Sequence, residues 1–543
     1  MAKVTGGRLA VKALKKEGVK CVFTLCGGHI DPILQACLDE QVRVIDVRHE
    51  QAAAFAAEGW ARATGKPGVA LATAGPGVTN MITGMWNSFE CLAPVILFGG
   101  RSPLAEFELG SLQDMDSLSL VQSVTKWRRP GYETKRIPEY VSMACRQAIS
   151  GRPGPAYLEF PHDILAAEVD EEGVIFPVSY RTTARPQGEP GQIKEAVNLL
   201  LKAKKPVVIA GSGVWWSRAG AELREFIELV KLPLTLIQMA RGAVPEDHPL
   251  CFGPTRVGTK ESDVVLLIGT RLNYGLNFGR PGLFSGEGKW IQIDIEPEEI
   301  GRNRPIDIGI VGDAKAVLRQ MIEEARDRCK GRQEPPWLEE CRQYVSSRQK
   351  QLEVEMHSDS MPIHPARLCR EIRDFIDRDA TIVMDGGDAT IWGAAVFKSY
   401  EPGHWLDNGP TGCLGVGVPF ALAAKVARPD KQVLLLQGDG SFGLNGMEFD
   451  TMVRHNIPVV CVICNDEAWG MVLHGQLACG ENRCVGSRLG FRPYHKMVEA
   501  LGGYGEVVEK PAEIRPALQR AFASGLPACI NVRCASIARG ARR

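Results

Sequence analysis

Two polar residues late in the chain have a spacing that suits a metal and a diphosphate. The hydrophobic run Val433–Leu436 ends in Gly438-Asp439-Gly440-Ser441, and the next hydrophobic run ends at Asn465. If both runs are strands of one parallel sheet, joined through a helix by a right-handed crossover, Asp439 and Asn465 project from the same sheet edge. Together with water and a main-chain carbonyl near Glu467, they suit an octahedral Mg²⁺ that also holds a diphosphate.

The short Gly438–Ser441 motif also lets backbone N–H groups of Gly440 and Ser441 approach phosphate at a helix N-terminus. Taken alone, such a turn often joins a strand to a helix and binds nothing. The 24 residues between Gly440 and Asn465 favour a ligand, because this spacing resembles the diphosphate-binding fingerprint of thiamine-diphosphate enzymes. The family often has a second asparagine, where this chain has Asp466.

Glu50 is the predicted catalytic residue. It begins a helical pattern after Arg48-His49, where a single glutamate usually only compensates the helix dipole. In its context it resembles the family's glutamate that hydrogen-bonds the aminopyrimidine ring of thiamine and drives it to the imino tautomer, which takes the thiazolium proton. That role needs an apolar pocket poor in water, and Ala52–Phe55 are apolar.

Three further stretches resemble cofactor loops of the acetolactate-synthase-like superfamily of these enzymes. Ala72–Asn80 resembles the loop lining the pyrimidine pocket, Asp385–Asp388 the diphosphate loop, and Gly412–Gly415 the turn that holds the pyrimidine. Leu414, otherwise an ordinary core leucine, resembles the side chain that bends the cofactor into a V. The resemblance assigns cofactor binding to Glu50, Gly75, Gly387, Asp388, Gly412, Leu414, Gly440, Ser441 and Asn465, and metal binding to Asp439, Asn465 and Glu467.

His29 and Gln113 are the predicted proton handlers. Gly27–Ile30 and Leu112-Gln113 resemble the histidine and glutamine that face substrate in benzaldehyde lyase and in 2-hydroxyacyl-CoA lyases. A lone histidine in a glycine-rich loop is more often a hydrogen-bonded surface group. The matching glutamine favours the functional interpretation of His29.

The middle of the chain also resembles lyases of this superfamily. Ala240–Pro249 and Arg271–Gly279 are similar to 2-hydroxyacyl-CoA lyases and oxalyl-CoA decarboxylases, which hold an adenine nucleotide there. Ala210–Gly213 follows a predicted strand and suits a nucleotide, although short glycine turns often serve only the turn. The expected cofactors are thiamine diphosphate and Mg²⁺, with ADP, CoA or FAD as a candidate ligand of the central domain.

The resemblance implies a carbon–carbon lyase or ligase that acts on 2-hydroxyacyl-CoA or 2-hydroxy ketone (acyloin) substrates through an enamine. An acetolactate-synthase-like enzyme and a 2-keto acid or oxalyl-CoA decarboxylase are the alternatives. Acetolactate synthases carry a tryptophan after Gly470-Met471-Val472 that selects the second keto acid, and here Gly475 occupies that position. A catalytically idle paralogue and a flavin-dependent oxidase also stay open, although Glu50, Asp439 and Asn465 together argue against the first.

Repeated strands and amphipathic segments position these residues. Short β-branched runs alternate with helical patterns throughout, which is typical of parallel α/β sheets. Polar, proline-containing stretches at 177–192 and 331–365 suggest linkers. We therefore expect three α/β domains, each a mostly parallel sheet flanked by helices: a pyrimidine-binding domain at 1–180, a central domain at 190–335 and a diphosphate-binding domain at 360–543.

Composition excludes several other classes of protein. The 64 basic residues balance 64 acidic ones, so no basic surplus points to nucleic acid. No apolar run approaches the roughly 20 residues that span a bilayer, and no signal peptide is recognisable. The 16 cysteines stand singly in apolar runs, typical of thiols in a reducing compartment. We expect a cytoplasmic enzyme of small molecules that forms a homodimer or homotetramer.

Overall fold

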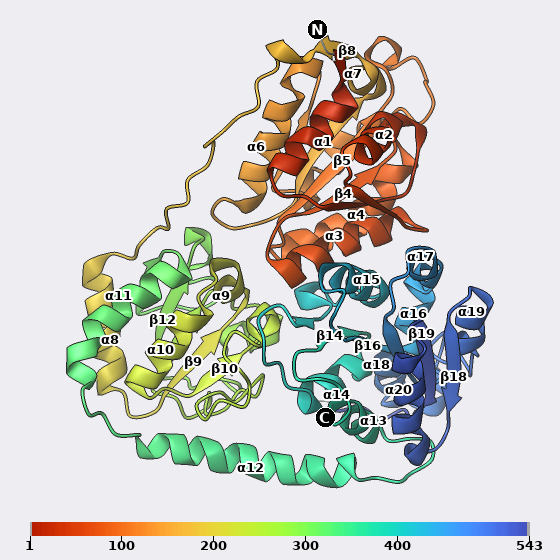
Figure 1. Cartoon of the computed structure of the whole chain (residues 1–543). Helices are drawn as coiled ribbons and strands as arrows, with labels where there is room; N and C mark the ends of the chain where they lie inside the picture. Colours follow the sequence, from red (N-terminus) through yellow and green to blue (C-terminus); the bar gives the residue numbers. More distant parts are fainter. Residues whose placement is uncertain (1–2, 540–543) are drawn as a thin grey trace.

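Three parallel β-sheets organise the molecule, one in each third of the chain (Figure 1). The computed structural model describes residues 3–539. Helices flank each of the three sheets, so the predicted fold class is confirmed. A short antiparallel pair, β1 (Lys3–Thr5) with β8 (Glu168–Asp170), joins the two ends of the first domain.

The first domain surrounds a six-stranded sheet whose four inner strands are buried and mostly apolar, because helices cover both faces. In sheet order the strands are β3 (Arg43–Asp46), β2 (Cys21–Thr24), β4 (Gly68–Ala72), β5 (Val95–Arg101), β7 (Ala156–Pro161) and β6 (Trp127–Pro130). Its helices are α1 (Gly6–Lys16), α2 (Asp31–Asp39), α3 (Glu50–Thr64), α4 (Pro76–Glu90), α5 (Ser117–Leu120), α6 (Ile137–Ile149) and α7 (His162–Ala166).

The central domain has a five-stranded sheet. Its strands, in sheet order, are β10 (Leu234–Leu236), β9 (Pro206–Ala210), β11 (Val264–Ile268), β12 (Lys289–Asp294) and β13 (Ile308–Val311). Its helices are α8 (Pro190–Lys202), α9 (Ser212–Ser217), α10 (Gly220–Val230) and α11 (Ala314–Arg326).

The third domain repeats the six-stranded plan. Its strands, in sheet order, are β15 (Trp405–Leu406), β14 (Thr381–Asp385), β16 (Val433–Gly438), β17 (Val460–Asn465), β19 (Ala528–Arg533) and β18 (Tyr504–Val508). Its helices are α13 (Pro365–Arg373), α14 (Asp388–Val396), α15 (Gly417–Ala427), α16 (Asp439–Asn445), α17 (Glu448–Arg454), α18 (Gly470–Leu477), α19 (Tyr494–Ala500) and α20 (Ile514–Ala523). Because β14, β16 and β17 are parallel neighbours, their carboxyl ends meet at one edge, as the sequence predicts.

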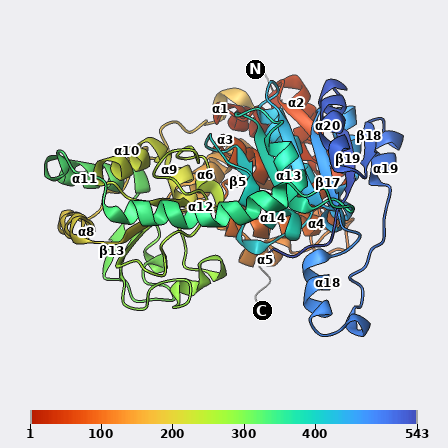
Figure 2. The same ribbon diagram turned by 90° about the horizontal axis from the view of Figure 1, so that it is seen from below.

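The two predicted linker regions differ. From Val174 to Glu189 the chain has no helix or strand, whereas 331–365 contains the 21-residue helix α12 (Pro336–Met356). Figure 2 shows α12 running from the central to the third domain, and α18 protruding from the body. The buried residues of α12 cluster near its two ends, with few between, which explains why its sequence resembles a linker.

Helix α3 packs along α15 and joins the first domain to the third. Both helices are rich in alanine, and their buried residues belong to one hydrophobic core. A Cβ at Gly59 would lie 2.9 Å from the Cα of Phe420, so the approach of the backbones needs glycine there. At the end of α3, the buried Arg62 donates to the Asp407 carbonyl at 2.6 Å and to its carboxylate at 3.0 Å.

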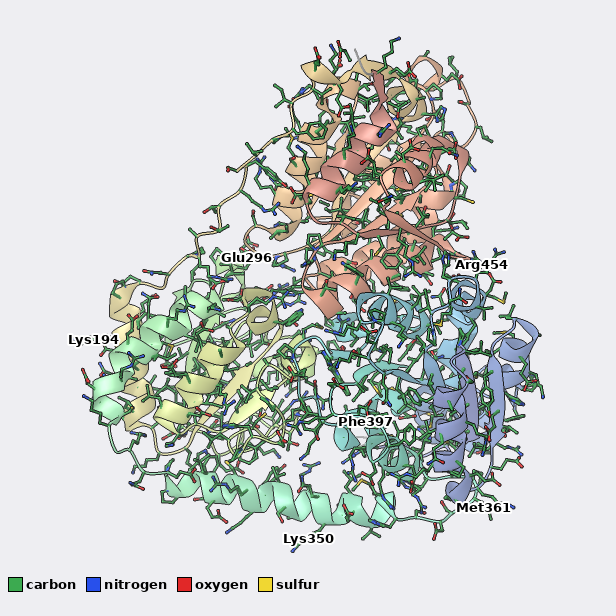
Figure 3. The ribbon with its side chains drawn as sticks, in the orientation of Figure 1. Lys194, Glu296, Lys350, Met361, Phe397 and Arg454 are labelled. Atoms are coloured by element: carbon green, nitrogen blue, oxygen red, sulfur yellow. The ribbon has the colours of Figure 1, made fainter. Side chains whose placement is uncertain are left out.

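A buried ion pair joins the central domain to the third. Glu246 accepts from Arg241 through both oxygens, at 2.6 and 2.7 Å, and also from the Ser399 amide. Arg241 also donates to the carbonyl of Phe397, which Figure 3 labels at the boundary between these domains. Both charged side chains are about 2% exposed or less.

We expect Glu246→Ala to lower the free energy of unfolding by about 3–5 kcal/mol, because it leaves the buried Arg241 charge without its carboxylate. Arg326→Ala breaks an exposed pair with Glu225 and should cost less than about 1 kcal/mol. Urea denaturation of both variants tests the difference. Equal small losses would show that Arg241 finds compensation elsewhere.

Candidate active site

A cavity of about 490 Å³ opens at the carboxyl edge of the third sheet. It brings together seven of the residues predicted to bind cofactor or metal. Among the described residues that line it, only Tyr274 comes from outside the third domain and its flanking segments. The predicted lining residues are Gly387, Asp388, Gly412, Leu414, Asp439, Gly440 and Ser441.

Asp439 is a buried carboxyl group of this cavity. It begins α16 and is 1% exposed, and neither of its carboxylate oxygens has a hydrogen-bond partner among the described residues. Burial, reinforced by the neighbouring carboxylate of Asp466, raises the pKa of Asp439 to about 8. Buried carboxylates without partners are costly unless a cation compensates them. The environment of Asp439 therefore fits the divalent metal that the sequence predicts.

Asn465 and Glu467 stand at and just beyond the end of β17, the strand that pairs with β16 ahead of Asp439. Asn465 ends β17, is buried, and its Oδ1 accepts from the Glu467 amide at 3.1 Å. The Glu467 carbonyl accepts from the amides of Leu489 and Gly490, at 2.7 and 3.0 Å. Asp466 lines the cavity, whereas neither Asn465 nor Glu467 is among its described lining residues. A metal-ligand role for Glu467 stays a prediction, and it requires the carbonyl to leave these two amides.

Glycines form a close-fitting floor under the cavity. A Cβ at Gly387 would lie 2.4 Å from the Met471 sulfur, and one at Gly440 would lie 2.5 Å from the Trp469 ring. Gly386, with φ of +100°, faces the amide of Gly438. Because these glycines have no side chains, the backbone N–H groups beside the first turn of α16 can approach a diphosphate.

Asp385 fixes the turn that carries Gly412 and Leu414. Its Oδ2 accepts from the amides of Gly415 and Gly417, at 3.0 and 2.9 Å, while Oδ1 accepts from Gly386 at 2.6 Å. Complete burial raises the pKa of Asp385 to about 7, although the three amides oppose the shift. One carboxylate therefore couples the predicted diphosphate loop to the predicted pyrimidine turn.

Glu50 lies in a second cluster, in the first domain. It is the first residue of α3, is 6% exposed, and its Oε2 accepts from Asn80 Nδ2 at 2.9 Å. His49 caps the helix by accepting the Gln51 amide through Nδ1. Asn80 belongs to the stretch predicted to line the pyrimidine pocket, and it orients the carboxylate.

His29 and Gln113 meet through Thr73. His29 Nδ1 lies 3.0 Å from Thr73 Oγ1, which lies 3.5 Å from Gln113 Oε1. Burial, with a smaller contribution from His162, lowers the pKa of His29, so the ring is neutral near pH 7. Gly75 has φ of +58°, and a Cβ there would lie 2.8 Å from the Gln113 carbonyl.

The two clusters remain separate within one chain. None of Glu50, His29, Gln113 and Gly75 is among the described residues that line the third-domain cavity.

Within residues 3–539, no helix is long and apolar enough to cross a membrane.

Models of known families match all three domains. They are described as the N-terminal TPP binding domain, the central domain and the C-terminal TPP binding domain of thiamine pyrophosphate enzymes, over residues 4–120, 193–321 and 385–532. A "Probable acetolactate synthase" of Mycobacterium bovis is 41% identical over 532 residues, covering 97% of this chain and 95% of that protein. The chain is a thiamine pyrophosphate enzyme.

Relatives with other names also match over nearly the whole length. A "2-hydroxyacyl-CoA lyase" of Arabidopsis thaliana is 31% identical over 547 residues, covering 97% of this chain and 95% of that protein. "2-hydroxyacyl-CoA lyase 1" of Homo sapiens is 29% identical over 548 residues, covering 97% and 94%. The predicted superfamily is confirmed, and the chain is an enzyme of carbon–carbon chemistry that uses thiamine pyrophosphate, the same compound as thiamine diphosphate.

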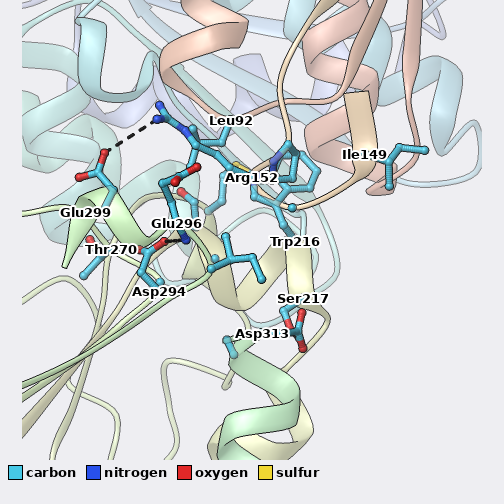
Figure 4. A pocket seen from close by; sticks show the side chains of 18 of the residues that line it. Leu92, Ile149, Arg152, Trp216, Ser217, Thr270, Asp294, Glu296, Glu299 and Asp313 are labelled. Carbon is cyan, nitrogen blue, oxygen red and sulfur yellow. Dashed lines mark hydrogen bonds and ion pairs between the residues drawn. The ribbon is translucent and has the colours of Figure 1, made fainter. Parts of the chain in front are cut away.

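Another cavity, of about 460 Å³, lies where the central domain meets the first (Figure 4). Asp294, at the carboxyl end of β12, lines it, and burial raises the pKa of Asp294 to about 6. Gly213, of the predicted nucleotide turn, also lines it, and Arg152 lies 3.9 Å from Glu299 on its wall. Gly409 lines both this cavity and the third-domain cavity.

Sequence inspection missed three residues that shape the site. Asp385 was visible only as part of a glycine-rich loop, Asn80 only as the end of a matching stretch, and Thr73 only as a neighbour of Gly75. Each acts through a contact between distant segments, 30 to 44 residues apart. The only signal in the sequence is a polar residue near the end of a predicted strand or the start of a predicted helix.

The residues that line the third-domain cavity fit thiamine pyrophosphate with a divalent metal. Asp439 would hold the metal, the backbone amides beside Gly387 and Gly440 would hold the diphosphate, and Leu414 would give an apolar contact to the cofactor. When bound, the cofactor acts as an electron sink for cleavage next to a carbonyl. The residues that line the cavity would position it.

We expect Asp439→Ala to abolish binding of thiamine pyrophosphate in the presence of Mg²⁺ while the fold persists, because the diphosphate charge then lacks its metal. Asp450→Ala removes a partly exposed carboxylate from α17 and serves as the control. Isothermal titration calorimetry measures both affinities, and circular dichroism checks the fold. Unchanged affinity in folded Asp439→Ala would rule out the metal assignment.

Proposed function

We propose that the enzyme is a carbon–carbon lyase or ligase that acts on 2-hydroxyacyl-CoA or 2-hydroxy ketone substrates. The observation that carries this proposal is the polar array His29–Thr73–Gln113, which shares the first domain with Glu50. A substrate with a hydroxyl on the cleaved bond must lose that proton, and a neutral histidine can accept it.

In this proposal each residue has a separate task. Glu50, oriented by Asn80, holds the pyrimidine proton, and His29 takes the substrate hydroxyl proton. Gln113, which packs on Gly75, orients the substrate oxygen. The space around Gly475 is open, since a Cβ there would meet no atom within 4 Å.

Acetolactate synthesis is the second candidate, because the M. bovis relative has that name and 41% identity. The absence of tryptophan at Gly475 counts against it. Purified enzyme with thiamine pyrophosphate and Mg²⁺ should be incubated with 2-hydroxyacyl-CoAs, aromatic acyloins, pyruvate and oxalyl-CoA, and the products identified by mass spectrometry. Acetolactate from pyruvate, without cleavage of any hydroxyacyl substrate, would replace the proposed function with the second candidate.

We also propose that two chains complete each active site, as a homodimer or a dimer of dimers. The supporting observation is that Glu50 lies outside the third-domain cavity of its own chain. Apolar side chains around that cavity are exposed, among them Met471 and Val472 at about half exposure, and a partner's first domain would cover them. A fully active monomer in light-scattering chromatography would contradict this.

The cavity of the central domain suits an adenine nucleotide, ADP, CoA or FAD, because acidic residues at strand ends bind ribose hydroxyls in such folds.

The 16 free cysteines, mostly buried, favour a reducing compartment such as the cytoplasm.

We expect Asp294→Ala to weaken ADP binding at least about tenfold, which corresponds to one lost charge-assisted hydrogen bond of about 1.5–3 kcal/mol. Glu298→Ala, an exposed neighbour, should bind as the parent does. Calorimetry with ADP, CoA and FAD measures each affinity. If none binds the parent protein, the nucleotide assignment fails.

We expect Glu50→Gln and His29→Ala to fail at different steps. Glu50→Gln keeps the side-chain size but lacks the carboxylate that stabilises the protonated ring, so deuterium exchange at the thiazolium carbon should slow by about 10²- to 10⁴-fold. His29→Ala should leave that exchange intact and slow turnover of the hydroxyacyl substrate. Exchange is measured without substrate, and wild-type exchange in Glu50→Gln would disprove the activation role.

A further inference from the structure

Helix α17 lies along the connection that carries Glu50. Figure 3 labels Arg454, its last residue, at the boundary of the first and third domains. Arg454 donates to the Asp46 carboxylate at 2.6 Å and to the Asp46 carbonyl at 2.7 Å, and His455 Nε2 lies 2.7 Å from the same carboxylate. Asp46 ends β3 and stands four residues before Glu50 in the sequence. The carboxyl end of α17 therefore holds the chain just ahead of Glu50.

The amino end of α17 holds the next residues of the same connection. Glu448 is 1% exposed, and its two oxygens accept from the Arg48 amide at 3.0 and 3.1 Å. Thr451 donates a further hydrogen bond to Glu448 at 2.7 Å. A buried carboxylate thus fixes the peptide before His49, the N-cap of α3, and thereby the start of the helix on which Glu50 is the first residue.

Asn445 contacts both parts of the proposed site. We call them half-sites: one is the part of the first domain around Glu50, and the other is the third-domain cavity around Asp439. Its amide donates to Gln51 Oε1 at 3.0 Å and to the Gly415 carbonyl at 2.8 Å. Gly415 belongs to the turn of Leu414, and α16, which ends at Asn445, begins at Asp439. One short stretch of chain therefore runs from the metal-binding carboxylate of its own cavity to the backbone around Glu50.

We propose that Glu448 is a positioning residue for Glu50 of the same chain. It would then serve the cofactor bound in the partner chain's third-domain cavity, and not the cofactor bound at Asp439, which lies nine residues before Glu448 in its own chain. The inference rests on the proposed intersubunit active site. Glu448 is buried and has no cation at hydrogen-bond distance among the described residues, so its carboxylate depends for compensation on the Arg48 amide and the Thr451 hydroxyl.

The alternative is that Glu448 merely stabilises the fold. A carboxylate in the first turn of α17 favours the helix through its dipole, and its loss would then lower stability and affect both half-sites equally. A positioning role predicts an effect on the proton chemistry of Glu50 alone, because a displacement of about 1 Å can slow a reaction by about 10²-fold.

The first test uses the homo-oligomer with thiamine pyrophosphate and Mg²⁺ bound. Glu448→Gln keeps the size of the side chain but presents only one acceptor oxygen to Arg48. We expect deuterium exchange at the thiazolium carbon to slow by about 10- to 100-fold with cofactor affinity unchanged. Asp450→Asn, two residues along α17 and 3.7 Å from the Arg48 side chain, is the matched control and should exchange at the parent rate.

The second test uses a heterodimer with one complete site, purified through two different tags. One chain carries Asp439→Ala and keeps Glu50, and the other carries Glu50→Gln and keeps Asp439. Glu448→Gln is then added either to the chain with the intact Glu50 or to the chain with the intact Asp439. In the first arrangement we expect the same slowing of exchange, about 10- to 100-fold, as in the homo-oligomer. In the second arrangement we expect the exchange rate to change by less than about twofold.

The outcomes separate the inference from the function on which it rests. Equal losses in both arrangements, or no loss in either, would overturn the positioning role of Glu448. If the parent heterodimer shows no exchange above that of a Glu50→Gln homodimer, the intersubunit site itself is wrong, and the inference falls with it. Loss confined to the chain with the intact Asp439 would place Glu448 at its own half-site and likewise overturn it.

Discussion

The contact between α3 and α15 is the constraint on which the rest of the molecule depends. Gly59 lets the two backbones approach, and a common alanine-rich core fills the space around them. At the end of α3, Arg62 fixes the Asp407 segment. Because α3 begins with Glu50 and α15 follows the turn of Leu414, this single packing determines the direction in which each half-site faces. Neither half-site would keep its geometry if the helices slid.

Buried carboxylates without matching cations recur at this junction. Asp385 and Glu448 each hold backbone amides, whereas both oxygens of Asp439 lack hydrogen-bond partners among the described residues. This difference matches two different roles. A carboxylate that accepts from several backbone amides fixes a loop, whereas a buried carboxylate without partners fits the predicted metal. Desolvation raises the pKa of all three groups.

Sequence patterns predicted the chemistry at strand ends better than the contacts between domains. The spacing of Asp439 and Asn465 predicted two neighbouring parallel strands, and β16 and β17 are indeed paired, because strand, helix and strand leave few topologies. Glu448 gave no such signal, since its partner at Arg48 is 400 residues away. Helix α12 was also missed, because its interior lacks the apolar stripe on which periodicity depends.

The wall that the two cavities share has a thermodynamic consequence. Gly409 lines both of them, and Arg62, which lines the cavity of the central domain, binds the neighbouring Asp407. If a ligand of one cavity prefers one arrangement of this segment, it changes the affinity of the other cavity, and linkage requires the same factor in the reverse direction. Under that condition, occupancy of one cavity is measurable by titrating the other, even when the first ligand has no optical signal.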